Sequence, residues 1–262
     1  MDEMYCGERI YIHGVAVDKL TAASAETRIG SLLSLPAESP TAVFTPNAEM
    51  IYRAAADPTL SATLNAGDVN VPDGVGTVWA ARVQGTPLPE RVAGIDLGDT
   101  AMAVAARQGL SVFLLGGKPG VADRAAKQLA QKHPGLIIAG THHGYFEMEG
   151  EQNQKVIDSI RAASPALLIV CLGFPRQEHW ILANRRHLDG VRVAMALGGS
   201  LDVWSGDVRR APAIVRGAGL EWLWRVVSSP SRIKRAMALP AFVKLTLGKS
   251  FQQRRRARSL KQ

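Results

Sequence analysis

The stretch AASPALLIVCLGFP, residues 162–175, is the longest uncharged apolar part of the chain. It is too short to span a membrane, because a transmembrane helix needs about 20 apolar residues. A run that stays apolar from Ala166 to Gly173 is instead typical of a strand buried on both faces of a sheet. The amphipathic segment PRQEHWILANRRHL follows at residues 175–188. The stretch therefore predicts a buried strand that leads into a helix.

The same alternation runs through most of the chain. We predict strands in RIYIHGVAV (9–17), TAVFT (41–45), VNVP (69–72), LSVFLLGG (110–117), GLIIAGT (135–141), ALLIVCLG (166–173) and VRVAMALGG (191–199). We predict helices in TAASAETRIGSLLSL (21–35), GVADRAAKQLAQKHP (120–134), EQNQKVIDSIRAAS (151–164) and the segment at 175–188. Apolar strands separated by helices indicate an α/β fold, a Rossmann-like, mostly parallel sheet with helices on both faces.

The composition suits one domain with an addition at its C-terminus. The chain has 262 residues and is 47% hydrophobic, which is enough for a sizeable core. We place a Rossmann-like core at residues 1–218 and a basic helical C-terminal appendage at residues 219–262. The N-terminal sequence lacks the features of a signal peptide, and two cysteines, Cys6 and Cys171, form no disulfide or metal framework. We therefore expect a cytoplasmic protein.

The positive charge is concentrated at the C-terminus. Residues 209–262 hold 14 Lys or Arg and one acid, Glu221, whereas residues 1–208 carry a net charge of −5. Such asymmetry predicts a polyanionic partner, either a nucleic acid or an anionic membrane. The tail has a helical pattern that we expect to be broken at Pro230 and Pro240. Its apolar and basic residues fit a helix at a membrane interface, and they fit equally a helix packed on the body with a solvated basic face.

Ligands of such sheets bind beyond the carboxyl ends of the strands. The residues after the predicted strands are therefore candidates for chemistry. They are Thr45, Asn47, Asp73, Gly116, Gly117, Tyr145, Gln177, Glu178 and Asp202.

Several of these candidates have a structural explanation as well as a chemical one. Asp73 follows a strand in VPDG, and Pro-Asp-Gly is a turn signal by itself. The turn LLGGKPG, residues 114–120, either brings backbone N–H groups to a phosphate or simply joins a strand to a helix. Glu178 complements a helix dipole, whereas the amide of Gln177 suits a hydrogen bond to a sugar or a phosphate. Asp202 suits a nucleobase or ribose, or an N-terminal helix cap.

Motifs of several enzyme classes are missing from the sequence. We find no HExxH, GxSxG, Asp-x-Asp or GxGxxG pattern and no P-loop. An acid, several amide and hydroxyl groups, glycine turns and many arginines remain. This set suits transfer between phosphorylated or hydroxylated substrates by base catalysis without a metal.

Taken together and in order, eight segments resemble the WecG/TagA/CpsF glycosyltransferases over roughly Arg9 to Leu245. The segments are TPNAEM (45–50), VPDGVGTVWAAR (71–82), RVAGIDL (91–97), FLLGGKPG (113–120), GYF (144–146), LGFPRQEHW (172–180), ALGGSLDVWSGDVRRAP (196–212) and GLEWLWRVVSSPSRIKR (219–235).

The resemblance implies an inverting, metal-independent enzyme without a cofactor. Such enzymes move a sugar, N-acetylmannosamine or its uronic acid or another hexose such as glucose, from a UDP-sugar to a polyprenyl-diphosphate-linked sugar. They serve the synthesis of bacterial surface or exopolysaccharides. The resemblance also implies self-association and a peripheral position on the inner face of the cell membrane, where the tail contacts anionic lipid.

Residue roles follow from the resemblance in the same way. Asp73 matches the proposed general base, and Thr45 and Asn47 match residues beside it that orient the sugars. Arg91 and Gln177 match further active-site positions. Tyr145 and Asp202 match positions near the uridine of the donor, to which we add Gly116, Gly117 and Glu178. Arg225, Arg232 and Arg235 match arginines that the appendage supplies to the diphosphate.

Two other functions fit parts of the sequence. A non-catalytic nucleic-acid-binding protein would explain the basic tail, but no known nucleic-acid-binding motif is present. A nucleotide-dependent enzyme of another class, such as a dehydrogenase, would explain the fold, but the dinucleotide fingerprint is missing.

Overall fold

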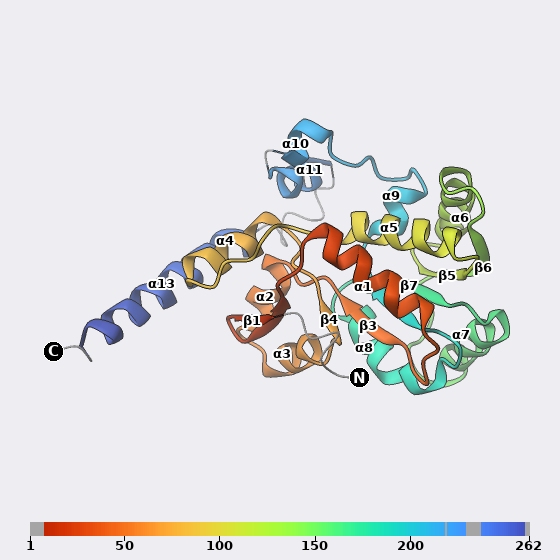
Figure 1. Cartoon of the computed structure of the whole chain (residues 1–262), viewed down its shortest axis with the longest axis horizontal. Coiled ribbons are helices and arrows are strands. Elements are labelled where there is room, and N and C mark those ends of the chain that lie inside the picture. The colour runs from red at the N-terminus through yellow and green to blue at the C-terminus, as the bar shows by residue number, and fades with distance from the viewer. Residues whose placement is uncertain (1–7, 218, 229–236, 260–262) are drawn as a thin grey trace.

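A computed structural model describes residues 8–217, 219–228 and 237–259. Six parallel strands form one sheet in the order β4-β3-β8-β7-β5-β6, and two further strands, β1 and β2, form a separate hairpin (Figure 1). The strands are β1 (Arg9–Ile12), β2 (Val15–Asp18), β3 (Thr41–Phe44), β4 (Val69–Asn70), β5 (Ser111–Gly116), β6 (Ile137–His142), β7 (Leu167–Cys171) and β8 (Val193–Ala196).

Helices connect the strands and continue into the tail. Before β7 they are α1 (Ala22–Ser34), α2 (Ala48–Ala54), α3 (Pro58–Asn65), α4 (Val75–Val83), α5 (Gly94–Arg107), α6 (Val121–Lys132) and α7 (Gly150–Ala163). After β7 they are α8 (Arg176–Asn184) with the 3₁₀ turn η1 (Arg185–His187), α9 (Ser200–Trp204), α10 (Ala213–Gly217), α11 (Glu221–Ser228) and α13 (Ala238–Ser259). The predicted α/β fold with a parallel, Rossmann-like sheet is confirmed.

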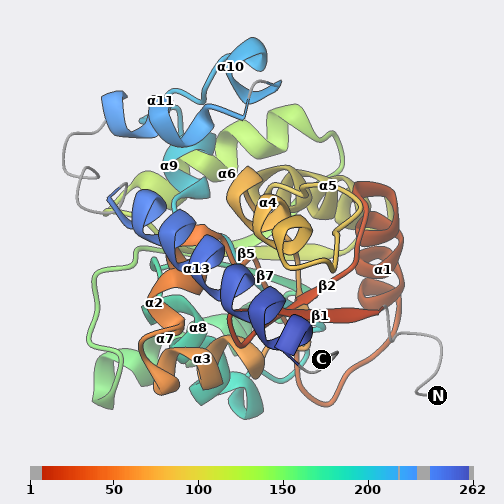
Figure 2. The ribbon, with the colours of Figure 1, turned by 90° about the vertical axis from the view of Figure 1, so that its left-hand side faces the viewer.

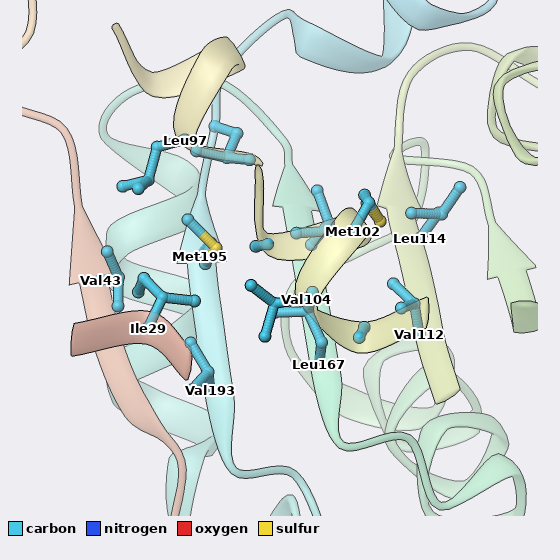
Figure 3. Packing of buried hydrophobic residues seen from close by; sticks show 14 of the residues in the cluster. Ile29, Val43, Leu97, Met102, Val104, Val112, Leu114, Leu167, Val193 and Met195 are labelled. Carbon is cyan, nitrogen blue, oxygen red and sulfur yellow. The ribbon is translucent and has the colours of Figure 1, made fainter. Parts of the chain in front are cut away.

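The strands of the sheet are apolar on both sides because both faces are covered. Side chains alternate between the faces along a strand, so Leu167 and Ile169 of β7 point to one face and Leu168 and Val170 to the other. Figure 3 shows the first face, where Ile29 of α1 packs over the sheet together with residues of α5. The second face is covered by α7 and α8. The buried strand and the helix that follows it, predicted from residues 162–188, are β7 and α8.

The segment RIYIHGVAV is a hairpin, so our prediction of one continuous strand there is wrong. Its backbone turns at His13 and Gly14, which have positive φ angles of 51° and 91°. Two consecutive residues with positive φ make the tight turn that joins antiparallel strands. His13-Gly14 is not one of the pairs that mark such a turn in a sequence, namely Asn-Gly, Asp-Gly and Gly-Gly, which is why the apolar run reads as unbroken.

The hairpin protects the outer edge of the sheet. The Asp18 carboxylate of β2 accepts a hydrogen bond of 2.7 Å from the backbone N–H of Asn70 in β4, where another strand would otherwise pair. Arg9 binds the same carboxylate through Nε at 2.7 Å and Nη2 at 3.1 Å. Since the Asp18 residue is only 1% exposed, these contacts fix β4 in place.

Helix α13 lies along α2 and α4 (Figure 2). Phe242, Thr246 and Ser250 recur every four residues on one face of the helix, and all three are buried. Pro240 lies in the first turn of α13 and does not break the helix, because a first-turn N–H needs no partner within the helix. Our prediction of a break at Pro240 is therefore wrong. This part of the tail is therefore packed on the body, and Pro230 lies outside the described residues. The division of the chain at residue 219 stays a prediction.

His13 connects the hairpin to α4 and α13. The Thr246 hydroxyl donates to the Phe242 carbonyl at 2.8 Å, so its oxygen accepts from His13 Nε2, also at 2.8 Å. On the other side of the ring, Nε2 of Gln84, the C-cap of α4, donates to His13 Nδ1 at 3.2 Å. The imidazole is therefore neutral, with its hydrogen on Nε2.

Replacing Asp18 with Ala should destabilise the protein by about 3–5 kcal/mol, because the Arg9 charge and the Asn70 N–H would lose a buried partner. Urea unfolding at neutral pH measures this change. The matched control is Glu8→Ala on the same hairpin, where an exposed pair with Lys19 is worth about 1 kcal/mol or less. Equal losses for the two variants would contradict the role of Asp18.

Candidate active site

On the two sides of β7 the chain leaves the carboxyl edge of the sheet in opposite directions. After β7 the chain enters α8 on one face, whereas after the neighbouring strands β5 and β8 it enters α6 and α9 on the opposite face. Ligands typically bind where the connections after two adjacent strands of a sheet leave its carboxyl edge toward opposite faces. The residues predicted from strand ends lie along this edge.

One half of the edge brings Thr45, Asn47 and Asp73 together. The Thr45 hydroxyl donates to the Ala196 carbonyl at 3.2 Å, which ties the end of β3 to the end of β8. Asn47 caps α2 by accepting from the Met50 N–H at 3.1 Å. The Asp73 backbone N–H donates to the Pro46 carbonyl at 3.3 Å, so the turn that carries Asp73 is attached between Thr45 and Asn47.

The turn at Asp73 is held by the Thr77 side chain and leads directly into α4. The Thr77 hydroxyl donates to the Asp73 carbonyl at 2.7 Å, and Gly74, with φ 82°, is the N-cap of α4. Asp73 is therefore not the cap residue, and it stands half-buried at the end of β4. The backbone of this residue is thus bound on one side to the segment after β3 and on the other to α4.

Arg91 reaches this half of the edge from outside the sheet. The N–H of the next residue, Val92, donates to the Pro72 carbonyl at 2.9 Å, directly before Asp73. The guanidinium of Arg91 forms a 3.7 Å ion pair with Glu221 of α11. These contacts bring the start of α11 to the candidate site.

Sequence reasoning did not assign a role to Glu221, although it is the single acid of a basic tail, a signal that could have marked it. Arg225 lies on the same helix, α11. Arg232 and Arg235 lie outside the described residues.

The other half of the edge is formed by glycine turns. A Cβ atom at Gly116 would lie 2.3 Å from the Cys171 carbonyl oxygen, so only glycine allows β5 and β7 to end this close together. The Gly144 N–H donates to the Gly117 carbonyl at 2.8 Å, which brings the loop after β6 to the same turn. Tyr145 follows in that loop and is 64% exposed.

Asp202 stands on α9 beside the end of β7, with intermediate exposure. Burial raises the pKa of the Cys171 thiol to about 12, and the nearby Asp202 carboxylate adds to this effect. Cys171 is thus a protonated core residue. In the part of the chain that the structure describes, no three His, Cys, Asp or Glu side chains are grouped to hold a metal ion.

Gln177 and Glu178 are buried below the carboxyl edge of the sheet, and they are 3% and 0% exposed. The Gln177 Oε1 atom accepts hydrogen bonds from the N–H groups of Gly173, at 3.2 Å, and Gly198, at 2.9 Å. Its Nε2 donates to Glu178 Oε1 at 2.8 Å. The amide of Gln177 thus joins the loop after β7 to the loop after β8, a connection that spacing in the sequence does not indicate.

Burial raises the pKa of Glu178 to about 7, against the opposing effects of the Gln177 hydrogen bond and the Arg53 charge. Near neutral pH a large fraction of the molecules therefore carries a protonated, uncharged carboxyl group here.

The free energy of unfolding should respond to this group. Because its pKa is raised on folding, its stabilising contribution is complete below about pH 4.5 and is lost as the pH rises through about 7. Glu178→Gln, which is always neutral, should therefore gain stability relative to wild type over that range. Thermal unfolding from pH 4.5 to 8 measures the difference, with the exposed Glu38→Gln as control. A difference that does not change with pH would contradict a buried, protonating Glu178.

Comparison with known proteins identifies the family. Residues 10–256 match the model of the glycosyl transferase WecG/TagA/CpsF family. A protein of Bacillus spizizenii is 36% identical over 205 residues, 78% of each chain. A protein of Staphylococcus aureus strain MW2 is 32% identical over 235 residues, 90% of this chain and 91% of the relative. A Bacillus subtilis protein is 32% identical over 226 residues, 86% and 82% of the two chains.

All three relatives carry the name N-acetylglucosaminyldiphosphoundecaprenol N-acetyl-beta-D-mannosaminyltransferase. The family match covers both halves of the candidate site and α11. The resemblance found in the sequence motifs is thereby confirmed, and the chain belongs to the glycosyl transferase WecG/TagA/CpsF family.

Proposed function

We propose that this glycosyltransferase moves a hexose or N-acetylhexosamine, of the N-acetylmannosamine type or glucose, from a UDP-sugar to a polyprenyl-diphosphate-linked sugar. The reaction inverts the configuration of the sugar and uses no metal. It serves the synthesis of a bacterial surface or exopolysaccharide. The names of the three relatives support both the transferred sugar and the lipid-linked acceptor. Family membership favours this function over a nucleic-acid-binding protein or a dehydrogenase.

The observation that carries the mechanism is the placement of Asp73 between Thr45, Asn47 and Arg91. Asp73 removes the proton of the acceptor hydroxyl as its oxygen attacks the anomeric carbon of the donor. A bond forms between that oxygen and the sugar, and the bond between the sugar and UDP breaks on the opposite side, which inverts the anomeric carbon. Thr45 and Asn47, whose backbones flank the Asp73 turn, orient the sugars.

The glycine half of the edge receives the nucleotide. The backbone at Gly116 and Gly117 lets the phosphates approach closely, Tyr145 lies against the uridine, and Asp202 binds the ribose. The leaving UDP gains negative charge during transfer. Arginine forks suit diphosphate oxygens, and we assign this role to Arg91 and to the tail arginines Arg225, Arg232 and Arg235.

The lipid-linked acceptor brings the reaction to the inner face of the cell membrane, so we place the enzyme there as a peripheral protein. Apolar side chains on and between α10 and α11 are exposed, namely Ile214, Leu220, Trp222, Leu223 and Val227. With the basic residues of the tail they suit contact with an anionic lipid surface. Among the described helices, none is both long enough and apolar enough to cross a bilayer. Self-association of the enzyme remains part of the proposal.

UDP release tests the proposed reaction and its base together. The donors are UDP-linked N-acetylmannosamine, its uronic acid, N-acetylglucosamine and glucose, each offered with polyprenyl-diphosphate-linked N-acetylglucosamine or glucose. With the productive pair, Asp73→Asn should lower kcat by about 100-fold or more, because the acceptor hydroxyl loses its base. The control Asp57→Asn makes the same change at the N-cap of α3, where Asn caps equally well, and should stay within about twofold of wild type.

Undiminished release by Asp73→Asn would remove Asp73 from the mechanism. Failure of every donor with every acceptor would overturn the proposed substrates.

A further inference from the structure

The Gln177 amide has only one orientation that satisfies its neighbours. The N–H groups of Gly173 and Gly198 both point to the same amide atom, at 3.2 and 2.9 Å. Since two N–H donors require an acceptor, this atom is the oxygen. The amide NH₂ group on the other side then needs an acceptor, and Glu178 Oε1 lies 2.8 Å from its nitrogen.

Burial makes this orientation depend on Glu178. Gln177 is 3% exposed and Glu178 is fully buried, so bulk water cannot replace a missing partner. Without an acceptor at position 178, the amide nitrogen would be buried with an unpaired hydrogen. Turning the amide over would not help, because its N–H groups would then face the two glycine N–H groups.

The two glycines belong to loops that the sheet itself does not hold. The last backbone hydrogen bond between the ends of β7 and β8 runs from the Leu197 N–H to the Val170 carbonyl, at 3.0 Å. Beyond it the chains diverge, and Gly173 and Gly198 take positive φ angles of 78° and 57°. The Gln177 oxygen connects the two loops beyond this point, where the chain turns to α8 on one face of the sheet and to α9 on the other.

We propose that Glu178 is a positioning residue, which orients the Gln177 amide so that the amide holds the glycine loops after β7 and β8 in the shape that receives the nucleotide of the donor. The inference rests on the proposed function for its ligand. It assigns to Glu178 an action through Gln177 and the loops, without contact to the substrate.

The chemistry of the Glu178 carboxyl group supports this role. A neutral carboxyl group has nearly the shape of an amide and presents one carbonyl-type oxygen, which is what the Gln177 nitrogen requires. Burial favours this neutral form in the folded protein. Among the described residues, Glu178 Oε2 has no hydrogen-bond partner, so Oε1 carries the polar contact that matters here.

The experiment compares Glu178→Met, which has similar size but no oxygen, with Glu178→Gln, which keeps an acceptor. Ile181→Val, another fully buried position of α8, controls for general loosening of the helix. Amide hydrogen exchange of Gly173 and Gly198, measured by NMR on ¹⁵N-glycine-labelled full-length protein, reports on the loops without any substrate. Calorimetry with UDP alone reports on the nucleotide site without transfer.

In Glu178→Met, both glycine amides should exchange about tenfold faster and UDP should bind about tenfold more weakly, the size of one lost hydrogen bond. Glu178→Gln should restore both quantities to within about threefold of wild type, and Ile181→Val should change neither by more than about twofold. The conservative variant thereby separates the acceptor from the acidity of the side chain.

Unchanged exchange and affinity in Glu178→Met would overturn the proposal. So would a Glu178→Gln variant as impaired as Glu178→Met, because the acceptor would then not be the property that matters. If exchange follows the prediction but the wild-type protein does not bind UDP, the positioning of the loops is supported and the proposed donor is contradicted.

Discussion

The burial of β7 on both faces is the constraint on which the rest of the structure depends. Leu167, Leu168, Ile169 and Val170 are all 0% exposed, so each face of the strand needs its own cover of helices. The helix that follows β7 can cover only one of those faces, and the helices that follow the neighbouring strands cover the other. The opposite directions in which the chain leaves the carboxyl edge are thus a result of covering the core.

The edge strand β4 meets a different constraint. An unpaired strand edge exposes backbone groups that can pair with other chains, and here a carboxylate from a hairpin takes the place of a neighbouring strand. The same contact holds Asn70, the last residue of β4, three positions before Asp73. A group more than fifty residues away in sequence, Asp18, therefore helps to set the position of the proposed base.

The sequence predicts those features that depend on local patterns. The strands of the sheet and the helices α1, α6, α7 and α8 follow from apolar runs and amphipathic periods. The residues after β3 and β4 follow from the rule that ligands bind at the carboxyl edge. The hairpin is missed because a histidine, not an Asn-Gly pair, makes the turn, and Pro240 is misread because its effect depends on its position within a helix.

Contacts between distant segments cannot be read from such patterns. Arg91 follows no strand, and only the family resemblance points to it; a hydrogen bond from Val92 to Pro72 brings it to the site. The ion pair between Arg91 and Glu221 joins residues 130 positions apart. The amide of Gln177 looks like a substrate contact in the sequence, whereas the structure shows its hydrogen bonds to two loops and to Glu178.

The neutral ring of His13 has a consequence for how the tail is attached. Both ring nitrogens are already used, one as donor to Thr246 and one as acceptor from Gln84, so a second proton would face an N–H group. Burial, with the nearby Lys249, lowers the pKa of His13 to about 4. Histidines often act as switches near neutral pH, but this one does not. The contact between the N-terminal hairpin and α13 therefore keeps the same protonation state from neutral to mildly acidic pH.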